Sequence, residues 1–205
     1  TSIGAVLLAF IISAIILAAT GADPFKVFSY FFKSSFGSWG AFSDVIVKAT
    51  PLLLIGLGCS LAFRMRLWNI GAEGQFFVGA FLASAVVMVP LVDLDTTPRW
   101  AIISLMAALG MLGGSLYAFI AGFLKAKLNI NEIIITLMLN YIAVLWNNYW
   151  IFGKWSEAGF QMTKTFPKVA WLPRLADYAK EVPAFSGMTL HLGILFGLIA
   201  AVIVY

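Results

Sequence analysis

Residues 66–77 read RLWNIGAEGQFF and place two carboxamides and a carboxylate, Asn69, Gln75 and Glu73, within seven positions of one another. An apolar run lies on each side of them. A carboxylate accepts hydrogen bonds, and a carboxamide both donates and accepts them. Together these side chains could hold the hydroxyl groups and ring N–H groups of a small polar solute.

Two glycines lie between these polar residues, at positions 71 and 74. If a helix begins at Asn69, Glu73 lies one turn further along the same face. Gly71 and Gly74 would then leave backbone N–H groups bare, and a helix N-terminus with bare amides binds anions and hydrogen-bond acceptors. In the alternative interpretation, Asn69 is merely the N-cap, and the helix dipole favours Glu73 in the first turn. The sequence leaves both interpretations open.

A second polar set lies on one face of a later apolar segment. Glu132, Thr136 and Asn140 are spaced i, i+4 and i+8, and Asn147 continues the row one heptad further on. Lipid cannot satisfy these groups, so the row must face the interior of a helix bundle or a water-filled path. A seam of interhelical hydrogen bonds, worth about 0.6–2 kcal/mol per contact, is the alternative. We favour a pathway lining because four polar residues exceed what packing needs.

The composition sets the fold class. Hydrophobic residues make up 62% of the 205 positions and charged residues 11%, and the mean hydropathy is +0.98. A soluble domain is closer to a quarter charged. We therefore predict an all-α, polytopic helical membrane protein. The net charge of +4 does not indicate nucleic-acid binding, because the basic residues are scattered or flank apolar runs.

Six apolar segments are each near the ~20 residues that cross a bilayer. Pro51 and the pair Gly56 and Gly58 interrupt the second, which makes it a candidate discontinuous helix. The six predicted segments are 3–20, 45–63, 70–92, 100–123, 130–152 and 188–205.

The connections predict an orientation. Two short links carry only basic residues at their centres, Arg64 with Arg66 and Lys125 with Lys127, and the positive-inside rule places both links in the cytoplasm. Segment 153–187 is then an extracytoplasmic loop. We expect 1–205 to form a single transmembrane domain, truncated at both ends, of a multi-pass protein in a cell membrane.

The sequence lacks the residues that metal binding, nucleophilic catalysis or ATP binding would need. The single cysteine, Cys59, is most simply a small buried hydrophobe, and His191 is an interfacial residue without a second His or Cys to complete a metal site. The sequence shows no Ser/His/Asp set and no phosphate-cradling GxxxxGK[ST]. If ATP is used, another chain binds it.

Three stretches resemble the permeases of ABC transporters. LAFRMRLWNIGAEGQFFVGAF (61–81), with its core NIGAEGQ, looks like the signature of the simple-sugar and nucleoside branch, which is related to the ribose and branched-chain amino-acid permeases. AGFLKAKLNINEIIITLMLNYIA (121–143) and KATPLLLIGLGCSLAFR (48–64) are similar to further stretches of that family.

The resemblance implies a function. The chain would be one of two permease subunits of a bacterial importer, together with a related permease, a cytosolic ATPase that carries ATP and Mg, and an extracytoplasmic solute-binding lipoprotein. The form AEGQ points toward nucleosides more than ribose. The coupling region for the ATPase would lie beyond residue 205. Transport by alternating access would then run along a path or gate lined or braced by Asn69, Glu73, Gln75, Glu132, Thr136, Asn140 and Asn147.

Two other classes of function remain to be weighed. An ATP-independent secondary transporter or channel would need ion or proton sites, for which Glu73 and Glu132 could serve. A membrane-embedded enzyme would need a metal or nucleophile set, which the sequence lacks. Whether residues 66–77 contact substrate or form a gate is open, and the position of Arg66 near the cytoplasmic face favours a gate.

Overall fold

The computed structural model describes residues 2–89, 91–157, 159–160 and 162–205, and its regular elements over these residues are helices. The chain divides into two compact units. One comprises Thr1–Ala49 with Arg174–Ile194, and the other comprises Thr50–Pro173 with Leu195–Tyr205. The predicted all-α class is confirmed.

The first unit contains a helix that the sequence analysis did not resolve. After α1 (Ser2–Ala19), the chain turns at Gly21, whose φ of +82° suits a residue without a side chain, and α2 (Pro24–Phe36) begins. The Asp23 carboxylate accepts the N–H groups of Phe25 and Lys26, at 3.0 and 3.3 Å, and so caps the new helix. A proline at N1 completes a standard helix start.

In the rest of this unit, the beginning of α3 (Trp39–Arg64) contacts the segment that precedes α7, residues 174–192. The N–H of Leu175 donates to the carbonyl of Leu190 at 2.8 Å, and the N–H of Ala176 donates to that of Met188 at 3.1 Å. The Ser43 hydroxyl accepts the N–H of Leu190 at 2.7 Å. The backbone around Leu190 is thus used in pairing and cannot be helical. Therefore α7 (Gly193–Val204) begins five residues later than predicted.

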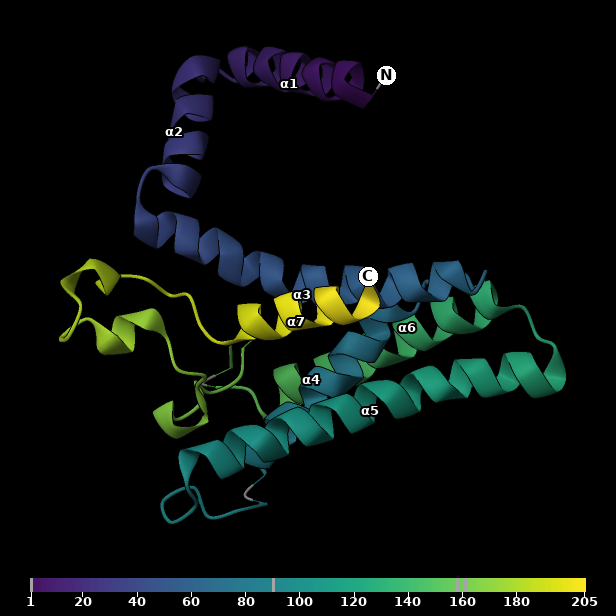
Figure 1. Ribbon diagram of the computed structural model, residues 1–205. Coiled ribbons are helices and arrows are strands. Elements are labelled where there is room, and N and C mark those ends of the chain that lie inside the picture. Colours follow the sequence, from purple (N-terminus) through teal and green to yellow (C-terminus); the bar gives the residue numbers. More distant parts are fainter. Residues whose placement is uncertain (1, 90, 158, 161) are drawn as a thin grey trace. The chain divides into compact units, whose positions relative to one another are not determined.

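Three helices form the centre of the second unit. In Figure 1, α4 (Ala72–Met88) lies beside both α5 (Arg99–Leu128) and α6 (Glu132–Tyr149). A Cβ atom on Gly79 would lie 2.9 Å from the carbonyl oxygen of Gly110, so α4 and α5 approach at a distance that only glycine permits. Val86 on α4 and Ile102 on α5 are fully buried.

Among the residues that the structure describes, four helices are long and apolar enough to cross a membrane, and they match four of the six predicted segments. They are Ser2–Ala19, Trp39–Arg64, Arg99–Leu128 and Glu132–Lys154. The other two predicted segments form shorter helices, α4 and α7. Residues 70–71 form a turn ahead of α4, and at its end Val89 is extended, as a residue before proline prefers. The predicted interruption at Pro51 is wrong, because α3 is continuous through it.

Large apolar side chains on the outer faces of these helices remain exposed. Met111, Leu145 and Phe119 are 70%, 68% and 64% exposed. Such surfaces suit lipid and not water. The chain is therefore that of a multi-pass helical membrane protein.

The segment after α6 is built from short turns. A π-helical turn, Trp150–Lys154, extends α6, and three 3₁₀ turns follow at Lys168–Ala170, Leu175–Tyr178 and Pro183–Phe185. In the second unit, the Arg99 guanidinium donates twice to the Trp171 carbonyl, at 3.0 and 2.6 Å. These bonds hold residues near Trp171 against the start of α5.

Candidate functional site

The two polar sets that the sequence presented separately meet where α4 begins. The Thr136 hydroxyl accepts the N–H of Ile70 at 3.3 Å. The Asn140 carbonyl oxygen Oδ1 accepts the N–H of Gly74, and its Nδ2 donates to the Glu73 carboxylate at 3.2 Å. Residues 69–75 together with Thr136 and Asn140 are called the polar junction below. The row on α6 thus binds the first turn of α4.

Asn69 and Gln75 pair with each other inside this junction. The Asn69 Nδ2 donates to the Gln75 Oε1, and the Gln75 Nε2 donates to the Asn69 Oδ1, both at 3.2 Å. The same Asn69 oxygen accepts the N–H of Gly71 at 3.0 Å. Each carboxamide therefore satisfies the other across the start of the helix.

The helix begins later than the sequence interpretation assumed. Its N-cap is Gly71, which makes no side-chain cap, and Ala72 is its first residue. Asn69 is thus neither the first helical residue nor the N-cap, although Glu73 does lie in the first turn. The amides expected to be bare are occupied, because Asn69 and Asn140 accept the N–H groups of Gly71 and Gly74.

The two glycines are needed for close approach. A Cβ atom on Gly71 would lie 2.9 Å from the Thr136 carbonyl oxygen. One on Gly74 would lie 2.8 Å from the Asn140 Oδ1 and 3.0 Å from its Cα. Both glycines therefore let the backbone of α4 reach the side chains of α6.

Burial changes across the junction. Thr136 is 4% exposed and both glycines are buried, whereas Glu73 is exposed and Asn140 is half-buried. Glu73 is the single charged residue of the junction, and the positive end of the α4 dipole favours its carboxylate there. The junction is a closed network of hydrogen bonds with one anionic edge.

The other two predicted site residues lie outside the junction. The Glu132 carboxylate forms an ion pair with the Lys125 Nζ at 2.9 Å, which closes the turn between α5 and α6. Its backbone carbonyl accepts the Thr136 hydroxyl at 2.7 Å. Asn147 is buried, at 8% exposure, and joins none of the contacts of the junction.

Two contributors were missed by the sequence analysis. The sequence pattern presents Lys125 as a topology signal, yet a lysine at the end of one helix and a glutamate at the start of the next can pair across a short turn. Tyr117 lies in the middle of α5, and its hydroxyl donates to the Leu139 carbonyl on α6 at 2.7 Å. A lone tyrosine in an apolar helix was the available signal, since a buried phenol needs a partner.

Metal chemistry has no candidate in the part of the chain that the structure describes: no group of three or more His, Cys, Asp or Glu side chains there could hold a metal ion. His191 instead accepts the N–H of Gly193 at 3.0 Å through its Nδ1, next to the start of α7. The junction can therefore act only through non-covalent interactions, with a charged edge and a fixed contact between two helices.

Comparison with known proteins identifies the family. Residues 41–205 match the family described as the permease component of the branched-chain amino acid transport system. The chain belongs to this permease family. The matched region contains the whole polar junction, and it excludes α1 and α2.

Three curated relatives are similar to the chain over nearly its whole length. The glucose ABC transporter permease protein TsgB13 of Haloferax volcanii is 32% identical over 100% of this chain and 53% of its own length. The guanosine ABC transporter permease protein NupP of Bacillus subtilis is 32% identical over 98% of this chain and 55% of its own. The nucleoside ABC transporter permease protein NupB of Lactococcus lactis is 29% identical over 97% and 54%, respectively.

The chain spans about half the length of these relatives. No solved structure matches it. The predicted resemblance to the simple-sugar and nucleoside permeases is confirmed by the family and by the relatives that it brings together.

Proposed function

We propose that the chain is a permease subunit of an ATP-driven ABC importer that carries nucleosides, or related simple sugars, into the cell by alternating access. Its membership of the permease family carries this proposal. Two relatives named for guanosine and for nucleosides, and one named for glucose, support the substrate class.

The transporter would need further chains. A cytosolic ABC ATPase would bind ATP and Mg, since the sequence lacks a P-loop. A second, related permease would complete the path, and an extracytoplasmic solute-binding lipoprotein would deliver the substrate. The permease would lie in a bacterial cell membrane, with Arg64, Arg66, Lys125 and Lys127 at the cytoplasmic side, as the positive-inside rule favours.

The polar junction would act mainly as a brace between two moving helices. Hydrogen bonds of the junction join its own members: Asn69 and Gln75 bond each other, and Thr136 and Asn140 bond the start of α4. The first turn of α4 would then move together with α6. Such rigid coupling is what a gate requires, because the gate residue must follow the helix that moves.

Glu73 would be the part of the junction that meets the path or closes it. One carboxylate oxygen accepts from Asn140 at 3.2 Å, and the residue is exposed. An exposed carboxylate on an apolar bundle is costly against lipid, so we place this edge toward the partner permease and the water-filled path. Asn147 and Glu132 remain candidates for the path at other levels of α6.

The test is an uptake assay on the full-length permease expressed with its neighbouring transport genes. Labelled guanosine and uridine would be followed, with excess unlabelled ribose or leucine as competitors, in wild type, Glu73→Gln and Asn140→Ala. Glutamine keeps an oxygen that can accept from Asn140 and removes only the charge. Asn140→Ala removes the brace.

Nucleoside uptake that survives a proton uncoupler, stops on ATP depletion and ignores ribose and leucine would support the proposed activity. Its loss in Glu73→Gln at normal protein levels would support a role for the charge in transport. Competition by ribose or leucine would move the substrate to another branch of the family. Normal uptake by Glu73→Gln would make Glu73 a feature of helix stability alone.

A further inference from the structure

The short helix α2 lies outside the residues that match the permease family, and it has one aromatic face and one basic face. Phe25, Phe28 and Phe32 are spaced i, i+3 and i+7 and share one face, whereas Lys26 and Lys33, seven residues apart, share another. The helix itself contains no acidic residue, and the carboxylate of its N-cap, Asp23, lies 3.8 Å from the Lys26 Nζ in an exposed pair. Its 13 residues reach about 20 Å, well short of the ~30 Å hydrocarbon core, so α2 cannot be a membrane span.

Apart from Phe28, which contacts Phe10 of α1, the aromatic side chains of α2 have little cover within the described residues. None of the residues of α2 is buried, and Phe25, Phe31 and Phe32 are 86%, 58% and 51% exposed. Soluble surfaces rarely leave several large aromatic rings together in water. This face must therefore contact something apolar.

The position of α2 in the chain indicates what that is. It follows α1, whose 18 apolar residues can cross the membrane, after a turn at Gly21, so the chain has just left the bilayer when α2 begins. Within this unit the chain bends sharply between the two helices, so that α2 runs away from the axis of α1 (Figure 1). That place at the end of a span, together with its amphipathic character, suits a helix that lies along the membrane surface.

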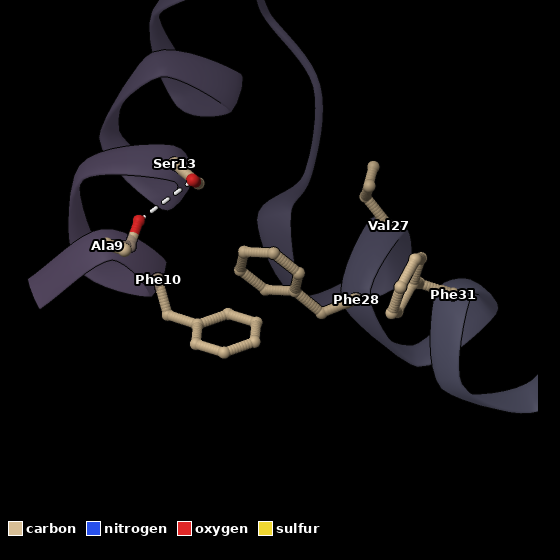
Figure 2. Close-up of a pocket in the computed structure, with 6 residues that line it drawn as sticks. All are labelled: Ala9, Phe10, Ser13, Val27, Phe28 and Phe31. Carbon is tan, nitrogen blue, oxygen red and sulfur yellow. Dashed lines mark hydrogen bonds between the residues drawn. The ribbon is translucent and has the colours of Figure 1, made fainter. Parts of the chain in front are cut away.

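A groove between the two helices has the same chemistry. Figure 2 shows Phe10 of α1 and Phe28 of α2 facing each other, with ring centroids 5.5 Å apart and the rings edge to face. The groove holds about 320 Å³, and Ser13, its single hydroxyl, already donates to the Ala9 carbonyl at 2.8 Å. The groove therefore has an apolar lining, which suits an acyl chain. Its lining comprises Ala9, Phe10, Ser13, Val27, Phe28 and Phe31.

We infer that α2 is an interfacial helix that lies in the phospholipid surface at the end of α1, with its phenylalanine face among the acyl chains and Lys26 and Lys33 at the phosphate groups. The positive charges of the two lysines favour a lipid surface over a protein partner. Lys26 and Lys33 each follow a phenylalanine of that face and so lie about 100° around the helix from it, where they reach a layer of phosphates while the rings stay in hydrocarbon, as in membrane-surface helices. Continuity with a membrane span holds α2 at that depth.

The test uses the complete transporter in nanodiscs of phosphatidylethanolamine and phosphatidylglycerol. In a Cys59→Ala background, a nitroxide would be attached to a single cysteine placed at Phe32 or, as the matched control, at Lys33. Collisions of each label with oxygen, which concentrates in the bilayer, and with a water-soluble nickel chelate would be measured. We expect the ratio of oxygen to nickel collisions to be severalfold higher at Phe32 than at Lys33.

Two outcomes would overturn the inference. Nickel-dominated collisions at both positions would place α2 in water. A label at Phe32 that is shielded from both reagents would mean that a protein covers this face. If the substitution at Phe32 prevents assembly, Phe25 and Lys26, one heptad earlier, provide the same comparison.

Discussion

The side-chain amide of Asn140 on α6 donates to the carboxylate of Glu73 on α4 at 3.2 Å, across 67 positions of sequence. The other end of the same amide accepts the N–H of Gly74. One side chain therefore holds both a backbone group and a charge of the neighbouring helix. The position of the carboxylate is set by α6 as much as by its own helix.

Replacing Asn140 with alanine should destabilise the protein more than any loss of packing explains. The N–H of Gly74 is buried, and without its partner it would carry the cost of an unsatisfied group, about 1–3 kcal/mol. The thermal unfolding midpoint in nanodiscs measures this change. Met138→Ala, two residues away and 50% exposed, is the control and should change the midpoint little. Equal midpoints for the two variants would contradict the brace.

Gly74→Ala should also be destabilising, for a steric reason. The added Cβ would lie 2.8 Å from the Asn140 Oδ1 and 3.0 Å from its Cα, so α6 would have to move. Gly122→Ala on α5 is the matched control, because its Cβ would meet nothing within 4 Å and alanine favours helix by about 1 kcal/mol. Unfolding midpoints of the two variants should move in opposite directions. A midpoint for Gly74→Ala at or above that of wild type would show that α6 yields without cost.

The sequence predicted the shared face of Thr136 and Asn140 correctly, because residues four apart on a helix necessarily lie together. It could not say which helix that face meets, since periodicity describes one helix at a time. Nor could it place the start of α4. Asn69 has a side chain that competes for backbone N–H groups, and its bonds to Gly71 and Gln75 belong to a turn and not to a helix.

Two other differences have similar causes. Residues near Leu190 are apolar enough to continue α7, yet their backbone pairs with residues near Leu175, a contact from another part of the chain. Helix α2 was hidden because its aromatic face is too short to resemble a membrane span. The pair Asp23 and Pro24, a cap followed by a proline at N1, was its local signal.

The Lys125–Glu132 ion pair should stabilise the turn between α5 and α6 modestly. Its N–O distance is 2.9 Å, and the two side chains are 36% and 20% exposed, so solvent screens part of the attraction. Lys125→Gln should lower the free energy of unfolding only slightly, and less at high salt. Lys127→Gln removes the same charge two residues further on and is the control.

A double variant would separate the pair from its surroundings. Lys125→Glu combined with Glu132→Lys restores opposite charges across the turn, although it places a cation at the start of α6, where the helix dipole opposes it. Unfolding measured for both single variants and the double should give a favourable coupling energy. Simple additivity of the two single effects would show that the ion pair contributes nothing.

The backbone pairing of residues 175–176 with residues 188–190 should weaken in acid because of His191, which lies in the extended stretch before α7. Burial, and then the positive charge of Arg174, lower the pKa of this imidazole below its usual 6.5. The neutral ring accepts the N–H of Gly193 through its Nδ1, at 3.0 Å, and a protonated ring could not. A histidine whose pKa is lower in the folded state than in the unfolded state favours folding fully above 6.5. That contribution is lost as the pH falls below 6.5 and through the depressed pKa.

The unfolding midpoint of the wild type should therefore fall between pH 7.5 and pH 5 by more than that of His191→Gln, which keeps a hydrogen-bond acceptor and does not titrate over about this range. Hydrogen exchange at the amides of Leu175 and Ala176, which pair with this stretch, would report the same loosening locally. An identical pH dependence in the two proteins would assign the acid sensitivity to carboxylates elsewhere. A midpoint that rises on acidification in wild type alone would mean that the charged imidazole is favoured in the folded state, contrary to its surroundings.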